Sequence, residues 1–435
     1  MYPTALARLV SDPEGFLADP PTEPRVWRRT AEAVLSLADV DALFDHGSLQ
    51  QQMVSVVADG QRVPHGRYTW AGRPIQPGFS TVVRGGAISR LLRDKSTVVL
   101  ESLHRTWRPL GDLCRRLSYE TGLPIGANAF LTPRGAQGFA HHYDTHSVLI
   151  VQTSGSKTWQ LHPPVRTDPL EHQPFRAGDL SDADWERLRH GEPALEVVLR
   201  GGDVLWIPRG WIHNGFATGE HSLHVSLSFP ALTPHWIATE LVRRLDTRDA
   251  LRAEVPWGFG RSDTLRREAI AGTVELLLDA LRGLDQDEAA EPLADAYRRY
   301  FLEPARAPVD SALADPEPDD VVCLVPEAAC GTSELDDGRV KVHLGDGAVI
   351  LDRPAATAVT GVLESGTAHP VPVRDLVPGA AVDECVELAG ELLRLGLLRR
   401  VPDGPAAESC GPAAESGGSA IGSGGPATEP NGPAA

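Results

Sequence analysis

Cysteine is scarce in this chain of 435 residues, and its five cysteines are scattered and odd in number. None of them forms the C-x-x-C pairs that zinc sites and redox motifs use. We therefore expect free thiols in a reducing cytoplasm, with neither a disulfide framework nor a zinc site. The cysteines are Cys114, Cys323, Cys330, Cys385 and Cys410.

Long apolar runs are also lacking, because no stretch approaches the roughly 18 residues that span a bilayer. The start, Met1–Thr4, has no basic segment followed by an apolar one, as a secretion signal would have. These absences predict a soluble, cytoplasmic protein without a membrane partner.

Positive charge is in deficit, with 41 lysines and arginines against 59 acidic residues and a net charge of −18. The chain as a whole therefore does not resemble a nucleic-acid-binding protein. Lysine is nearly absent, being found only at Lys95, Lys157 and Lys341. A lysine that falls within a motif is for this reason a candidate functional residue.

The residue pattern changes several times along the chain and predicts an α+β protein of more than one domain. Residues 1–230 end in short strands separated by Gly and Pro, which is typical of a sandwich or barrel. Ser147–Gln152 and Thr158–Leu161 are predicted as two strands with a turn at Gly155 between them.

Beyond the barrel, residues 231–302 carry apolar side chains at helical spacing, from which we predict a helical region that forms a homodimer. A linker at 303–320 leads to residues 321–401, where a hairpin and two helices indicate a winged-helix-like module. That module lacks a basic recognition helix, so a structural or protein-binding role is favoured over nucleic acid. Residues 402–435, rich in Gly, Ala, Pro and Ser, are predicted to be a disordered tail.

Two segments within the barrel region combine into a predicted metal site. The first contains His142-Tyr143-Asp144, in which alternation along an extended chain places His142 and Asp144 on the same side. The second, Gly202–His213, is a buried strand followed by the rigid turn at 208–211, which we expect to present His213 from a loop. Two imidazoles and one carboxylate form a facial triad that leaves open positions on the metal.

The ligand set alone leaves the metal undecided, because two His and one carboxylate also bind Zn²⁺ in hydrolases. No H-E-x-x-H motif accompanies this triad, and the barrel context favours Fe(II). His141 and His146 are expected to lie near the metal or at the surface rather than to bind it.

An Fe(II) oxygenase needs a two-electron reductant, usually 2-oxoglutarate, whose far carboxylate requires a buried cation or hydroxyl groups. Lys157, at the start of a predicted strand, is a candidate counter-ion, although an exposed hairpin lysine is an equal alternative. His224, Ser226 and Ser228 alternate toward one face of the last strand, and Asn128 is a further inward candidate. A row of inward polar groups is costly unless it lines a polar cavity.

Taken together, these motifs resemble the JmjC-type, cupin-like 2-oxoglutarate oxygenases, and among them the ribosomal oxygenase branch. The resemblance implies a double-stranded β-helix (jelly-roll) core with flanking helices, a helical dimerisation region and a C-terminal winged helix. It implies that His142, Asp144 and His213 bind Fe(II). The same resemblance pairs Lys157 with 2-oxoglutarate and places Asn128, Ser228 and His224 beside it.

The implied activity is O₂-dependent hydroxylation of a protein side chain, such as a His or Arg of a ribosomal protein. A basic ribosomal protein would suit the acidic chain. Two alternatives remain open at this point. One is the same chemistry on a small molecule or biosynthetic peptide, and the other is a cupin module that binds a metal without turnover.

Overall fold

The computed structural model of the protein describes residues 5–70, 81–217, 219–301, 309–325, 328, 331–344, 347–365 and 369–401. The predicted tail at 402–435 and much of the predicted linker lie outside this part of the chain. The described residues divide into two compact units, of which the first holds 1–305 and 327–351 and the second holds 306–326 and 352–435. Within the described residues, no helix has both the length and the apolar character needed to cross a membrane.

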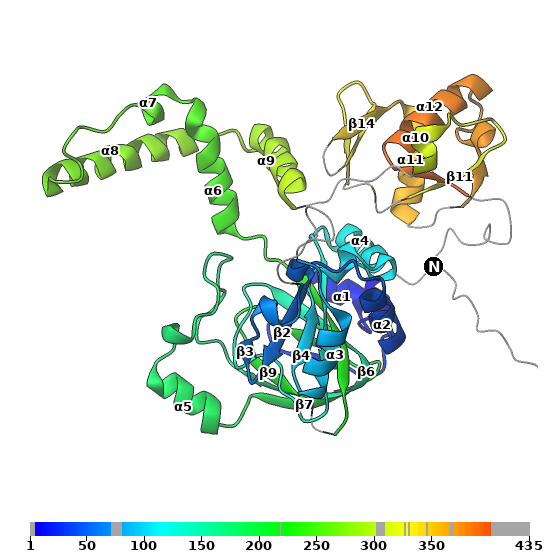
Figure 1. Ribbon diagram of the computed structural model, residues 1–435. Coiled ribbons are helices and arrows are strands. Elements are labelled where there is room, and N and C mark those ends of the chain that lie inside the picture. Colours follow the sequence, from blue (N-terminus) through cyan, green and yellow to red (C-terminus); the bar gives the residue numbers. More distant parts are fainter. Residues whose placement is uncertain are drawn as a thin grey trace, which may run out of the picture. The chain divides into compact units, whose positions relative to one another are not determined.

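The first unit is built on a sheet of ten strands, as the sequence predicted for a barrel or sandwich (Figure 1). The path through the sheet runs β1-β8-β6-β10-β5-β4-β2-β3, and β7 and β9 pair with β6. The strands are β1 Arg25–Trp27, β2 Val54–Ala58, β3 Gln61–Arg62, β4 Thr97–Leu100, β5 Gly126–Thr132, β6 Ser147–His162, β7 Leu195–Arg200, β8 Val204–Ile207, β9 Ile212–Phe216 and β10 Ser222–Phe229.

One long strand, β6, gives the sheet its jelly-roll shape. Its first half pairs with β8 and β10, and its second half pairs with β7 and β9. The predicted break at Gly155 is wrong, because the strand continues through it. Gly155 has φ +63°, and a Cβ there would lie 1.9 Å from the carbonyl oxygen of His221. Glycine therefore lets the strand bend where any side chain would collide.

Two apolar layers lie on the two faces of this sheet. Alternate residues of β5, β6 and β10 pack against helices from the first 120 residues, as with Leu149, Val151 and Val225. The opposite faces of β6 and β8 form the inside of the jelly roll, where Ile150, Trp159 and Leu205 meet. The helices around the sheet are α1 Pro13–Ala18, α2 Leu37–Asp45, α3 Gly85–Arg93, α4 Arg108–Thr121 and α5 Asp182–His190.

The region after the barrel is helical, as predicted, with α6 Pro234–Arg244, α7 Asp249–Arg252, α8 Asp263–Arg282 and α9 Gln286–Phe301. Three antiparallel strands also belong to the first unit: β12 Gly331–Glu334, β13 Val340–His343 and β14 Ala348–Leu351. The β13–β14 pair is the predicted hairpin. Two residues of its turn, 345 and 346, lie outside the described residues.

The second unit combines a three-stranded sheet, in the order β15-β11-β16, with three helices. Its elements are α10 Val309–Leu313, β11 Val321–Leu324, α11 Arg353–Ser365, β15 Val371–Pro372, α12 Val382–Arg394 and β16 Leu398–Arg400. Cys323 in β11 is disulfide-bonded, so the prediction of free thiols is wrong for this residue. Cys114 and Cys385 are free and buried. Pairing depends on the distance between two thiols in the fold, which spacing in the sequence does not reveal.

Candidate metal centre and co-substrate pocket

The three predicted metal ligands come together in the structure. One ligand atom from each of His142, Asp144 and His213 can be chosen so that all three lie within 4.8 Å of one another. His213 is held in β9 rather than in the loop that the sequence predicted. His142 pairs with it across an isolated antiparallel bridge, in which the amide of His213 donates to the carbonyl of His142 at 2.8 Å. Main-chain pairing thus fixes the spacing of the two histidines.

Carbonyl groups set the orientation of both imidazoles. His142 donates from Nδ1 to the carbonyl of Ala140 at 2.8 Å, and His213 donates from Nδ1 to the carbonyl of Trp211 at 3.0 Å. Because a carbonyl can only accept, the proton must be on Nδ1 in each ring. The lone pair on Nε2 is then free to bind a metal.

The distance between the rings fits neighbouring positions on one ion. Their centroids are 4.4 Å apart, with an angle of 52° between the planes. Two imidazoles bound at right angles, with metal–nitrogen distances of about 2.1 Å, would place their centroids about 4.5 Å apart. The carboxylate of Asp144 lies 3.7 Å from His213 Nε2 and offers a third ligand atom.

The charge states of these groups also suit metal binding. Burial lowers the pKa of His213 to about 4, with His142 adding to the effect, so the ring is neutral at pH 7. Burial acts to raise the pKa of Asp144, but His142, His213 and His146 lower it below its ordinary value. A neutral His213 beside an ionised Asp144 suits the coordination of a divalent cation.

Lys157 is buried within the jelly roll, with 3% of its surface exposed, so the exposed-hairpin alternative is wrong. Its ammonium lies 3.4 Å from the hydroxyl of Thr132 and 5.0 Å from the centre of the Trp159 ring. Burial lowers its pKa from 10.5 to about 7. Among the described residues no carboxylate pairs with this lysine, and an unpaired buried cation is a site for an anion.

Glycines make room for the lysine side chain. A Cβ at Gly215 would lie 2.8 Å from Lys157 Cε, and one at Gly138 would lie 3.2 Å from its Nζ. Two hydrogen-bonded backbone segments therefore lie close to Lys157, at positions where a side chain would crowd the lysine.

Six rings link the metal ligands to the surroundings of Lys157 in a closed circuit. In order, the rings are those of His142, Phe139, Phe130, His224, Trp159 and His213, after which the circuit returns to His142. The distances between successive ring centroids in this order are 5.6, 6.3, 4.8, 5.3, 6.1 and 4.4 Å. His224 lies flat against Phe130, with 3° between the planes. The triad and the buried lysine therefore belong to one aromatic-walled site.

Two buried polar atoms of this wall have no hydrogen-bond partner within the described residues, namely Trp159 Nε1 and His224 Nδ1. Burial, and next the charge of Lys157, lower the pKa of His224 well below its usual range, so it stays neutral. Unpaired buried polar atoms are rare in proteins unless a ligand or water completes them. These atoms and Lys157 together fit a ligand that carries a carboxylate.

The remaining predicted residues lie nearby on the same strands. Asn128 accepts a hydrogen bond at its Oδ1 from the amide of Ser102 at 2.8 Å, and Ser228 donates to the carbonyl of Gly126 at 3.2 Å. In the register of β5 and β10, Asn128 lies opposite Ser226. No hydrogen bond described for Asn128 or Ser228 reaches Lys157, so their share in the pocket stays a prediction.

Sequence reasoning missed several members of the site. Trp159 carried a usable signal, because it lies two residues after Lys157 and so faces the same side of β6. Thr132, Phe130 and Phe139 reach the site through pairing between strands, which a single sequence does not give. His141 takes the other side of its segment, where its ring centroid lies 5.6 Å from that of His162.

A second group of possible metal ligands consists of Glu291, Asp295 and His343. Its carboxylates already pair with Arg298 at 3.0 and 2.7 Å, and Lys341 lies 3.4 Å from Glu291. This group is an ion-pair network between α9 and the β12–β14 sheet.

Comparison with known proteins places these features in a family context. Residues 104–236 match the model of a family described as JmjC domain. A protein named bifunctional lysine-specific demethylase and histidyl-hydroxylase NO66, from Drosophila persimilis, is 34% identical over 254 residues, or 54% of this chain and 34% of that protein. Ribosomal oxygenase 1 of Gallus gallus is 31% identical over 296 residues, or 63% of this chain and 45% of that protein.

The NO66 protein of Aedes aegypti is 26% identical over 413 residues, which span 61% of its length. The chain thus covers less than two thirds of each of these relatives. Escherichia coli ycfD has the same fold, with a TM-score of 0.52 and 15% identity over 89% of this chain and 97% of that one. A second structure of it, described as a ribosomal oxygenase in complex with cobalt and 2-oxoglutarate, has a TM-score of 0.50 and 15% identity over 88% of this chain and 97% of that one.

Proposed function

We propose that this chain, whose residues 104–236 form a JmjC domain, is an Fe(II)- and 2-oxoglutarate-dependent oxygenase that hydroxylates a protein side chain. The observation that carries the proposal is the buried Lys157, which lacks a carboxylate partner among the described residues and shares an aromatic-walled site with a His–Asp–His triad. A module that binds a metal without turnover would need the triad but not the buried lysine.

His142, Asp144 and His213 would hold the iron on one face and leave the opposite positions to 2-oxoglutarate and O₂. When bound, Fe(II) supplies the activation of O₂ that couples decarboxylation of 2-oxoglutarate to hydroxylation. The chain's own contribution is orientation, because the carbonyls of Ala140 and Trp211 keep both Nε2 atoms directed to one point.

Lys157 would bind the distal carboxylate of 2-oxoglutarate, with the Thr132 hydroxyl beside it. Trp159 and His224 offer unpaired nitrogen atoms in the same wall. The apolar faces of these rings exclude water, which strengthens the ion pair. We also propose that Asn128 and Ser228, which lie on β5 and β10, line the edge of this site.

The proposed substrate is a His or Arg side chain of a basic ribosomal protein, met in the cytoplasm. Two relatives support this class by their names, one a histidyl-hydroxylase and the other a ribosomal oxygenase. The net charge of −18 favours encounter with a strongly basic protein and disfavours nucleic acid.

The test is to reconstitute the protein with Fe(II) without oxygen, add labelled 2-oxoglutarate and O₂, and measure succinate. We expect succinate from the wild type and none from His142→Ala. Basic ribosomal proteins added to the assay should raise the yield and gain the mass of one oxygen atom. The absence of succinate with every candidate substrate would contradict the proposal.

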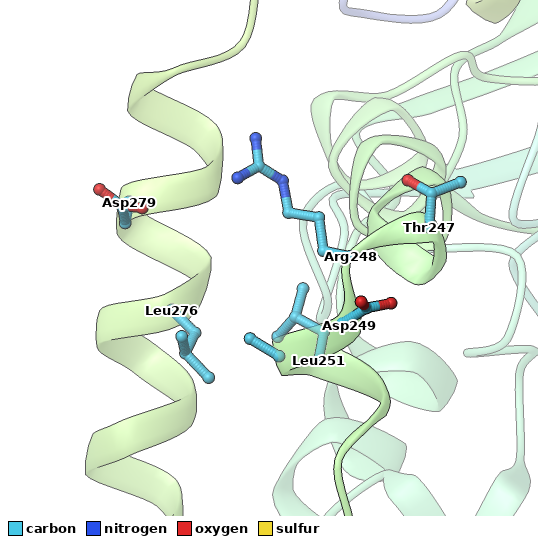
Figure 2. A pocket seen from close by; sticks show the side chains of 7 residues that line it. Thr247, Arg248, Asp249, Leu251, Leu276 and Asp279 are labelled. Carbon is cyan, nitrogen blue, oxygen red and sulfur yellow. The ribbon is translucent and has the colours of Figure 1, made fainter.

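We also propose that residues 231–302 form a homodimer interface. Helix α8 runs for 20 residues, and among its described side chains only Ala280 is buried. Its exposed apolar residues include Ile270, with 53% of its surface exposed, and Val274, with 46%. Figure 2 shows a pocket between α7 and α8, where Leu251 and Leu276 face each other beside Arg248. Exposed apolar surface of this kind marks an interaction site.

Light scattering at micromolar concentration should give the mass of a dimer. Substituting Ile270→Glu would place a charge in the interface, and the mass should fall to that of the monomer. Glu268→Gln changes charge on the same helix and is the control. A monomeric wild type would contradict the interface.

We propose a structural or protein-binding role for the winged-helix-like module predicted at 321–401, whose strands β12–β14 belong to the first compact unit and whose helices α11 and α12 belong to the second. Helix α12 bears Asp383, Glu384, Glu387 and Glu391, and Arg394 in its last turn is its basic residue. This charge pattern opposes the docking of that helix on phosphates.

A further inference from the structure

The hairpin of β2 and β3 reaches the segment that carries the first metal ligand. Its turn residues Asp59 and Gly60 have φ of +50° and +76°, the conformation that Asp-Gly favours in two-residue hairpins. Gly60 forms a parallel bridge with Phe139, three residues before His142. The hairpin turn thus pairs with a segment about 80 residues further along the chain, next to the proposed metal site.

Gly60 lies against the residue that orients His142. A Cβ at Gly60 would come within 3.3 Å of the Cβ of Ala140 and 3.5 Å of its amide nitrogen. The carbonyl of Ala140 accepts the Nδ1 proton of His142 at 2.8 Å. A side chain at Gly60 would therefore press on the residue whose carbonyl orients the His142 ring.

Arg62 provides a second connection to the same ligand. Its guanidinium carbon lies 5.8 Å from the centre of the Phe139 ring, and its NH1 donates to the hydroxyl of Ser55 at 2.9 Å. The Phe139 ring in turn meets the His142 ring at a centroid distance of 5.6 Å and an angle of 61°. Arg62 thus contacts Phe139, and Phe139 contacts the ring of His142.

We propose that the β2–β3 hairpin is a brace that positions His142 for metal binding, with Gly60 and Arg62 as its positioning residues. The inference rests on the proposed function, because it assumes that the triad binds a metal. The other two ligands are held differently, since His213 lies in β9 and the carbonyl of Asp144 accepts from the amide of Gly210 at 3.0 Å. A disturbed hairpin should therefore affect one ligand of the three.

The first test compares Gly60→Ala with Gly47→Ala in the full-length protein. Gly47 also has a positive φ, +64°, but the nearest atom to a Cβ there is 4.0 Å away, so the two variants share backbone strain and differ in contact. Titration with Co²⁺ should show about tenfold weaker binding or more for Gly60→Ala, as for other residues that orient metal ligands. Its visible cobalt absorption should also change, while Gly47→Ala keeps the affinity and spectrum of the wild type.

The second test uses Arg62→Met, an exposed substitution that leaves the fold intact, with Arg25→Met as its control. Arg25 also lies over an aromatic ring, 5.4 Å from the centre of Trp27, and no contact described for the chain joins it to the triad. Arg62→Met should weaken Co²⁺ binding and Arg25→Met should not. The comparison of Arg62→Met with Arg25→Met still tests the brace if Gly60→Ala does not fold.

Equal Co²⁺ affinity and spectra in Arg62→Met and the wild type would overturn the brace and leave the proposed function standing. A wild type that binds no Co²⁺ would overturn both, because the triad itself would then be wrong. The two failures are distinguished by the wild-type titration alone.

Discussion

Replacing Lys157 by methionine should stabilise the protein when no ligand is bound and abolish 2-oxoglutarate binding. Burial lowers the lysine pKa from 10.5 to about 7, and among the described residues no carboxylate offsets this cost. The unfolded chain thus binds more protons than the folded one between pH 7 and 10.5, so stability rises with pH across that window. Methionine keeps a long apolar stem and removes the charge.

The magnitude follows from the pKa difference of about 3.5 units. At 1.36 kcal/mol per unit, burying the lysine costs about 4 kcal/mol at pH 7 and about 2 kcal/mol at pH 9. These values are upper limits for the gain in Lys157→Met, which loses the contact with Thr132 and the packing on Trp159. The gain should therefore be clear at pH 7 and smaller at pH 9.

Urea unfolding of the metal-free protein at pH 7 and pH 9 measures the effect. Lys95→Met is the control, because Lys95 is exposed and its replacement should change the free energy of unfolding by less than about 0.5 kcal/mol. Added 2-oxoglutarate with Mn²⁺ should stabilise the wild type and not the variant. Destabilisation by Lys157→Met at both pH values, or an equal gain at both, would refute the reasoning.

Three further predictions concern the same barrel. Binding of 2-oxoglutarate should take up close to one proton at pH 8, because Lys157 must become charged. The affinity for 2-oxoglutarate should fall by up to about tenfold per pH unit above 7. Calorimetry in buffers of different ionisation enthalpy measures both the proton uptake and the affinity. Asp144→Asn should abolish Co²⁺ binding in a titration that His146→Ala leaves intact, and the reverse result would remove Asp144 from the ligand set. Gly155→Ala should lower the free energy of unfolding by about 2–4 kcal/mol, because its Cβ meets the carbonyl of His221; an unchanged urea midpoint would show that β6 bends for another reason.

The proximity of His142, Asp144 and His213 was predictable because these residues belong to short motifs whose local structure is simple. His142 and Asp144 share one side of an extended segment, and His213 follows a Pro-Arg-Gly-Trp turn that ends a buried strand. The orientation of the rings was not predictable, since it depends on the carbonyls of Ala140 and Trp211. Those hydrogen bonds depend on the backbone conformation around Ala140 and Trp211. The residue types in these segments do not specify that conformation.

The surroundings of Lys157 were predictable only in part. Lys157 stood out because lysine is rare, but its burial and its neighbours depend on the pairing of β5, β6 and β10. A single sequence does not give the register that places Phe130 against His224, and it therefore missed the aromatic wall. Gly155 was interpreted as part of a turn because glycine is frequent in turns. In the structure it lets the strand bend where the backbone of His221 lies too close for a side chain.

The most direct test of the central claim is the isotopic content of succinate formed under ¹⁸O₂. Decarboxylation of 2-oxoglutarate coupled to O₂ places one atom of the oxygen molecule in succinate and the other in the hydroxylated product. We predict that the reconstituted wild type forms succinate carrying one ¹⁸O atom in its carboxylates, and that Lys157→Met forms almost none. Succinate without ¹⁸O, or no succinate in the presence of Fe(II) and basic ribosomal proteins, would contradict the account.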